Sequence, residues 1–142
     1  MLKAGTILLL VLFVLTGAWS ILDIVAPSFT LEGDFQAVTG GSYEGALADG
    51  PLFIAKLYLR HIGVASLAVS VAAVFIVLGA FRKAERWAWW ALLATGVTVV
   101  GFGVAANLAI ANWFDFATHA VVLAWLLAGL LIPIRAFFGK KA

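Results

Sequence analysis

The sequence predicts an all-α membrane protein that forms a four-transmembrane-helix bundle. Of its 142 residues, 65% are hydrophobic and 11% are charged, whereas soluble domains average about 45–50% apolar and about 25% charged residues. A chain of this length cannot enclose so much apolar surface away from water. Four apolar runs are long enough to cross a hydrocarbon core, which takes about 20 helical residues, and they do not alternate as barrel strands do. We therefore expect one integral membrane domain over residues 1–142.

The first expected span covers residues 4–26. Lys3 followed by an apolar run over 7–15 is similar to the start of a secretory signal peptide. No A-x-A cleavage site follows, and the apolar run continues past Trp19. We therefore expect a retained helix.

The other three spans are expected over residues 62–81, 87–111 and 116–134. Pro51, with Asp49 near the N-cap, favours a helix start well before the span 62–81. That helix is about 31 residues long, or about 46 Å, and exceeds the bilayer core, so its first turns project outward.

Small residues in the spans predict where helices approach one another, because they let backbones come close in lipid. These residues are Thr16, Gly17 and Ser20 in the first span, Ala65, Ser66, Ser70 and Ala73 in the second, and Gly96, Gly101 and Gly103 in the third.

The polar, glycine-rich segment 27–50 is the long loop between the first two spans. A structureless loop of this length is unusual, so we expect it to fold back over the bundle on its apolar residues. Weak alternation predicts a short β-hairpin around Gly40 and Gly41.

Basic residues predict the orientation in the membrane. Lys56 and Arg60 share one side with six of the seven acidic residues, and the remaining seven of nine basic residues fall on the other side: Lys3, Arg82, Lys83, Arg86, Arg135, Lys140 and Lys141. We expect a multi-pass protein of the cell (inner or plasma) membrane with both termini cytoplasmic and the long loop extracytoplasmic. An aromatic belt at the cytoplasmic interface is expected from Trp87, Trp89 and Trp90.

Polar residues from all four spans are expected at one depth, near the outer interface. This candidate outer polar pocket comprises Asp23, Lys56, Arg60, His61, Asn107, Asn112, Asp115 and His119. Asp115 and His119 are four apart on one helix, so the acid could orient the imidazole, while Arg60 could bind an anion or pair with Asp23. The alternative is that these residues simply mark where the bilayer ends; Lys56 and Arg60 could equally hold an anionic lipid headgroup.

No cofactor is predicted. The chain has no cysteine, and His61, His119, Asp23 and Asp115 are suitable metal ligands without a local ligand spacing. Haem ligation by His61 and His119 is conceivable, although a membrane histidine more often bonds a neighbouring helix. The net charge of +2 is too small to indicate nucleic acid. Phosphate-loop, nucleophile-elbow and dinucleotide motifs are all missing, so no catalytic residue is predicted.

Two stretches carry a family resemblance: Arg60-His61-Ile62-Gly63, and the sequence FRKAERWAWW over residues 81–90. They resemble small four-span prokaryotic membrane proteins, and the layout is similar to that of the DoxX-like group. The resemblance implies a four-helix bundle without a defined activity. A claudin-type adhesive protein is disfavoured because the first loop lacks the cysteine pair of that family.

Two functions follow from these features. The first is an accessory or scaffold subunit of a larger membrane complex, or a lipid-binding bundle, whose partners are membrane lipids and other subunits or a second copy. The alternative is a redox-associated or small-molecule-binding protein that holds a quinone-like or anionic ligand in the outer polar pocket. A channel would need an oligomer, because one such bundle encloses no wet pore.

Overall fold

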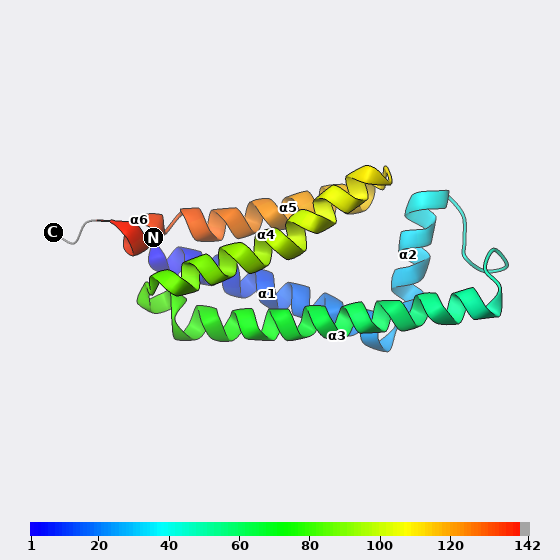
Figure 1. Ribbon diagram of the computed structural model, residues 1–142, viewed down its shortest axis with the longest axis horizontal. Coiled ribbons are helices and arrows are strands. Elements are labelled where there is room, and N and C mark those ends of the chain that lie inside the picture. The colour runs from blue at the N-terminus through cyan, green and yellow to red at the C-terminus, as the bar shows by residue number, and fades with distance from the viewer. Residues whose placement is uncertain (140–142) are drawn as a thin grey trace. The chain divides into compact units, whose positions relative to one another are not determined.

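The computed structural model describes residues 1–139, and all the regular secondary structure in this part of the chain is helical. The elements, in order, are α1 (Leu2–Val25), α2 (Pro27–Thr39), α3 (Asp49–Gly79), the short 3-10 helix η1 (Phe81–Lys83), α4 (Arg86–Ala109), α5 (Trp113–Leu131) and α6 (Ile134–Phe138) (Figure 1). The predicted all-α class is confirmed. Lys140 and Lys141, two of the basic residues assigned to the cytoplasmic side, lie outside the described residues.

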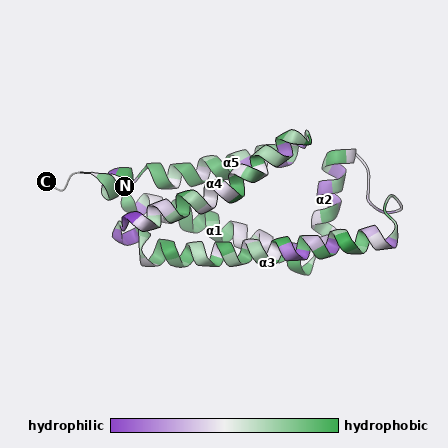
Figure 2. Ribbon diagram, in the orientation of Figure 1, coloured by the Kyte–Doolittle hydropathy of each residue, from purple (hydrophilic) through white to green (hydrophobic). Residues whose placement is uncertain are grey.

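Four helical segments are long and apolar enough to cross a membrane: Leu2–Val25, Asp49–Lys83, Arg86–Ala109 and Trp113–Leu131. The four predicted spans are therefore confirmed as helices of that kind. Figure 2 shows them hydrophobic along most of their length, with hydrophilic residues gathered around η1. The second of them includes the expected long helix, since α3 alone has 31 residues.

The predicted hairpin around Gly40 and Gly41 is wrong, because the first half of segment 27–50 is the 13-residue helix α2. Pro27 occupies its first turn, where a missing N–H costs nothing. Gly40 then ends the helix in the left-handed conformation, with φ 74° and its amide donating to the Gln36 carbonyl. The glycine pair therefore terminates a helix instead of turning a strand.

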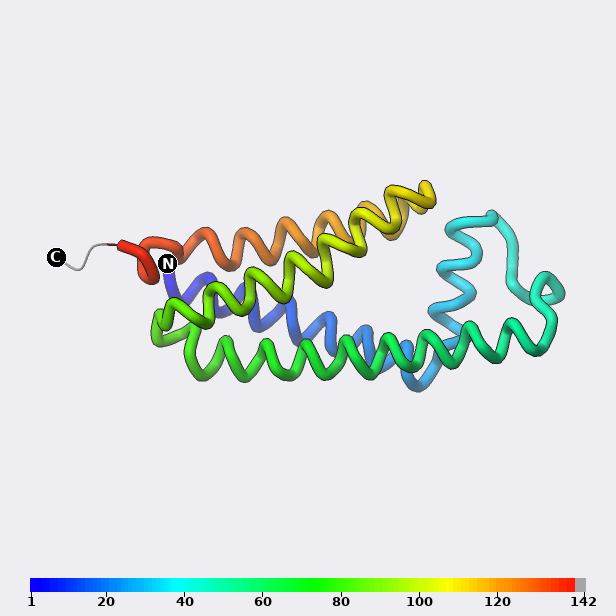
Figure 3. Tube along the Cα trace, in the orientation of Figure 1, coloured from blue at the N-terminus to red at the C-terminus, as the bar shows by residue number. Residues whose placement is uncertain are grey.

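The chain divides into two compact units, Leu15–Ser70 and a first unit made of Met1–Val14 with Val71–Ala142. The apolar core belongs to the first unit, and it draws on α1, α3, η1, α4, α5 and α6: Leu9, Leu12, Phe13, Ala73, Val77, Ala80, Phe81, Ala88, Trp89, Leu92, Leu126, Leu130 and Phe137. Within this unit, the start of α1, η1 and α6 lie at one end (Figure 3).

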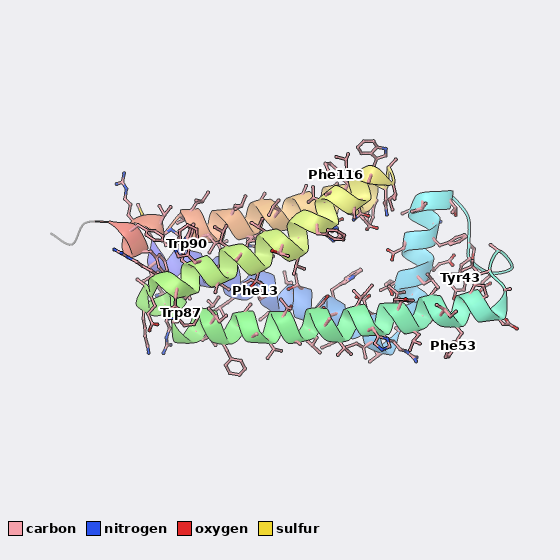
Figure 4. The ribbon with its side chains drawn as sticks, viewed as in Figure 1. Phe13, Tyr43, Phe53, Trp87, Trp90 and Phe116 are labelled. Atoms are coloured by element: carbon pink, nitrogen blue, oxygen red, sulfur yellow. The ribbon has the colours of Figure 1, made fainter. Side chains whose placement is uncertain are left out.

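Aromatic residues close that end of the first unit. The Phe81 and Phe137 rings are 4.7 Å apart, and the Trp89 indole donates to the Leu130 carbonyl at 2.9 Å. The expectation that Trp89 belongs to an interfacial belt is wrong, since it is 6% exposed whereas Trp87 and Trp90 are more than half exposed. Figure 4 labels these two flanking tryptophans at the start of α4.

The unit formed by Leu15–Ser70 is packed through small and polar residues instead. The Ser20 hydroxyl donates to the Thr16 carbonyl at 2.8 Å, and the Thr16 and Ser70 hydroxyls are 3.1 Å apart across α1 and α3. A Cβ on Gly63 would lie 2.8 Å from the Ser20 carbonyl oxygen, so the two helix backbones meet at this glycine.

The predicted small-residue contacts are therefore only partly confirmed. Gly17 faces Ser70 across this helix pair, and Gly96 faces Leu126 in the first unit. Ala65 is exposed instead of lying in a contact. Gly101 meets nothing beyond its own helix. Gly63, the glycine with the shortest contacts between α1 and α3, was not among the residues predicted.

Candidate functional site

The turn between α4 and α5 positions four of the eight predicted pocket residues. Asn112 is the N-cap of α5 and is 4% exposed. Its Oδ1 accepts from the Asp115 amide at 3.3 Å, and its Nδ2 donates to the Asp115 carboxylate at 2.6 Å. The residue before it, Ala111, has φ 56°. The two polar side chains thus complete a helix cap, which satisfies groups that every helix start leaves open.

His119 lies one turn further along α5, and its ring rests on Gly103 of α4. Its Nδ1 is 2.8 Å from the backbone carbonyl oxygen of Asp115. A carbonyl oxygen can only accept, so the neutral ring carries its proton on Nδ1 and leaves the lone pair on Nε2. The expectation that the Asp115 carboxylate orients the imidazole is wrong, because the main chain of that residue does so.

Asn107 belongs to the same cluster. Its Nδ2 donates to the Gly103 carbonyl at 2.9 Å and is 3.5 Å from His119 Nδ1. Since Nδ1 is a donor in the tautomer fixed by the Asp115 carbonyl, the Asn107 amide and this nitrogen present two donors to each other. The hydrogen bond that holds Asn107 is therefore the one to Gly103.

The other four pocket residues belong to the unit Leu15–Ser70. Asp23 is 9% exposed and lies near the Thr30 side chain, whose hydroxyl donates to the Pro27 carbonyl at 3.2 Å. Arg60 is exposed, and no ion pair between it and Asp23 is found in this unit. The expected pairing of these two residues is therefore wrong.

Lys56 and His61 have partners within the same unit. The Lys56 ammonium lies 5.5 Å from the Tyr43 ring centroid, a ring that Figure 4 labels beside α3. His61 Nδ1 is 2.8 Å from the Leu57 carbonyl oxygen, one helical turn back. Its free Nε2 repeats the tautomer of His119.

The eight residues thus form two groups of four, one in each unit, and the outer polar pocket that would join them stays a prediction. Within residues 1–139, no three His, Asp or Glu side chains are grouped as metal ligands.

A further feature, on α4, was not predicted as a unit. Ala94, Thr98 and Ala105 are exposed and Gly101 is half-buried; their 4-3-4 spacing puts them on one helix face. We call these four residues the α4 small-residue face. In the described chain, the Thr98 hydroxyl makes no hydrogen bond, whereas the Thr118 hydroxyl donates to its i−4 carbonyl, that of Phe114, at 3.0 Å. The 4-3-4 spacing is visible in the sequence and could have identified the face.

Comparison of the chain with protein-family models, with curated proteins and with solved structures found no match.

Proposed function

We propose that this protein is an accessory or scaffold subunit of the cell membrane that binds a neighbouring transmembrane helix through the α4 small-residue face. The observation that carries the proposal is the Thr98 hydroxyl, which is exposed in a spanning helix without a hydrogen-bond partner in residues 1–139.

The shape of this face suits a second helix. A Cβ on Gly101 would meet only Val97 of its own helix, at 3.8 Å, so the backbone there is open to approach. Of the four spanning segments, α4 is the least covered: 11% of its most apolar stretch is buried, against 28% for α1. Small residues at four-residue spacing allow the close backbone contact that holds helices together in lipid.

The Thr98 hydroxyl favours a protein over acyl chains as the occupant. Acyl chains offer no hydrogen-bond acceptor, and a hydroxyl left unpaired in hydrocarbon is unfavourable. A bond to a facing helix would contribute about 0.6–2 kcal/mol. Three of the other polar residues support a non-enzymatic role, because Asn107, Asn112 and Asp115 are engaged in bonds within the α4–α5 pair.

The proposal includes the orientation expected from the sequence. Arg82, Lys83 and Arg86 lie together in the η1 segment and the start of α4, and the positive-inside rule assigns such a loop to the cytoplasm. The similarity to DoxX-like four-span proteins agrees with this arrangement and adds no activity to it.

The test is the mass of the complex extracted gently from its native membrane, compared between matched variants. Thr98→Val removes one hydroxyl at constant shape, and Thr118→Val does the same on α5, where that hydroxyl serves its own helix. Ala105→Leu and Ala117→Leu add the same bulk to two exposed positions. We expect a complex larger than the 15.0 kDa chain whose share of the extracted protein falls with Thr98→Val and Ala105→Leu and is unchanged with the other two. A wild-type monomer, or equal effects from both pairs, would contradict the proposal.

A second candidate function rests on His119. Its Nε2 carries a lone pair within the α4–α5 pair, so it can accept a proton or a hydrogen bond from a hydroxyl, as in the reduced form of a quinone-like ligand. Under this proposal, His119→Ala abolishes binding of a water-soluble hydroquinone while the helical content and melting temperature stay close to wild type. Unchanged binding, or loss of fold alone, would remove this candidate.

A further inference from the structure

We infer that the end of the first unit that carries η1 holds a binding site for one anionic phospholipid, in an open groove of about 460 Å³ between α1 and η1. The groove is lined by Leu2, Lys3, Thr6, Ile7 and Arg82. This inference is independent of the partner helix proposed above, because none of these residues belongs to α4.

The fold brings two cations to this groove from distant parts of the chain. Lys3 stands in the first turn of α1, and Arg82 in η1, which follows the long helix α3. Ala84, with φ 58°, ends η1 and turns the chain back towards α4. Both cations are exposed, no carboxylate lines the groove, and neither residue forms an ion pair within residues 1–139. The charge of the groove is therefore uncompensated by the described chain.

The two cations and the apolar wall match the two parts of a phospholipid. A guanidinium binds phosphate oxygens through paired N–H groups, and an ammonium adds a point charge. The Thr6 hydroxyl donates to the Leu2 carbonyl at 2.9 Å, so phosphate recognition rests on Lys3 and Arg82. Ile7 is 51% exposed and leads from the charged end into the hydrophobic length of α1, where acyl chains would lie.

A neighbouring groove provides an internal contrast. Its lining includes Lys83, the residue after Arg82, together with the Glu85 carboxylate, on an otherwise apolar wall. Glu85 accepts from the Trp87 indole at 2.6 Å. One cation and one carboxylate cancel, so this groove has no net preference for an anion. Arg82 thus lines a groove with two cations, whereas the next residue, Lys83, lines a groove in which a carboxylate balances its charge.

The experiment compares lipid binding by two double variants that lose the same charge at the same end. Lys3→Gln with Arg82→Gln empties the groove of cations; Lys83→Gln with Arg135→Gln is the control. Each purified protein is placed in nanodiscs of phosphatidylcholine, either alone or mixed equally with phosphatidylglycerol, and retained lipids are counted by native mass spectrometry. Inorganic phosphate added to the detergent-solubilised protein tests whether the anion alone is sufficient.

We expect wild type and control to retain one phosphatidylglycerol, and the groove variant to lose affinity about fivefold for each cation removed, which is about 1 kcal/mol each. Lys3→Arg with Arg82→Lys keeps the charge and should restore retention, which separates lipid binding from misfolding. If the protein binds inorganic phosphate but does not retain phosphatidylglycerol, the lipid assignment is overturned. Equal losses in both double variants, or no preference for phosphatidylglycerol in wild type, would overturn the site.

Discussion

Two helix pairs in this protein use glycine in different ways. In the unit Leu15–Ser70, α1 and α3 meet at Gly63, where the neighbouring atoms include a backbone carbonyl oxygen and the Cβ of Asp23. In the first unit, α4 and α5 meet at Gly103, where all the nearest atoms belong to the His119 ring. One glycine lets two backbones touch, and the other makes room for a side chain. A Cβ added at Gly63 would meet backbone that cannot move aside, whereas one added at Gly103 would meet a side chain that a second substitution can remove.

The largest effect is expected from Gly63→Ala. Its Cβ would lie 2.8 Å from the Ser20 carbonyl oxygen and 2.8 Å from the Asp23 Cβ, so one helix has to shift, at about 2–3 kcal/mol. The measurement is the melting temperature in a mild detergent. Gly79→Ala on the same helix is the control, because nothing lies within 4 Å of that position and alanine favours the helix. If the two variants have the same melting temperature, α1 and α3 do not approach each other closely at Gly63.

The second largest effect is expected at Gly103, the glycine that makes room for the His119 ring. Gly103→Ala places a Cβ against the imidazole, 2.7 Å from its Nε2, and is expected to destabilise by about 1–3 kcal/mol. Because the obstacle is a side chain, His119→Ala should restore most of this loss in the double variant. Gly101→Ala, two residues away and open, is the control. If the double variant loses as much stability as the two single variants lose together, the glycine and the ring are not in contact.

The sequence predicted the parts of this fold that depend on hydrophobicity. The four spans follow from apolar runs of membrane length, and the start of α3 well before its span follows from Asp49 and Pro51. These signals depend only on the order of residues along the chain. Helix α2 was missed because glycine pairs mark both hairpin turns and helix ends, and only the observed φ of Gly40 separates the two.

The candidate site was harder to predict than the spans. The sequence indicated which residues share a depth, but hydrogen-bond partners depend on rotamers and helix rotation. Asp115 was expected to use its carboxylate on His119, yet the cap with Asn112 engages that carboxylate and leaves the backbone oxygen for the ring. Gly63 was overlooked as a contact for the same reason, since nothing local marks which face of α3 meets α1.

A third prediction concerns the cap itself. Asn112→Ala removes the side chain that accepts from the Asp115 amide and is expected to destabilise the α4–α5 pair by about 1 kcal/mol. Hydrogen exchange of the first turn of α5 should accelerate, while the α1–α3 pair keeps its protection. Asn112→Ser retains a capping oxygen and should recover most of the loss. Uniform acceleration in both pairs would show that the cap does not act locally.

The smallest effect has the opposite sign. Ala111 adopts φ 56°, a left-handed conformation that costs a residue with a Cβ about 1–2 kcal/mol. Glycine removes that cost but loses about 0.5–1 kcal/mol of chain entropy on folding, so Ala111→Gly should stabilise the α4–α5 pair by about 0.5 kcal/mol. Ala105→Gly within α4 is the matched control and should destabilise by about 1 kcal/mol. Because the two substitutions are chemically identical, opposite shifts in melting temperature can come only from the backbone conformation at the turn, and shifts of the same sign would show that Ala111 is not held in the left-handed region.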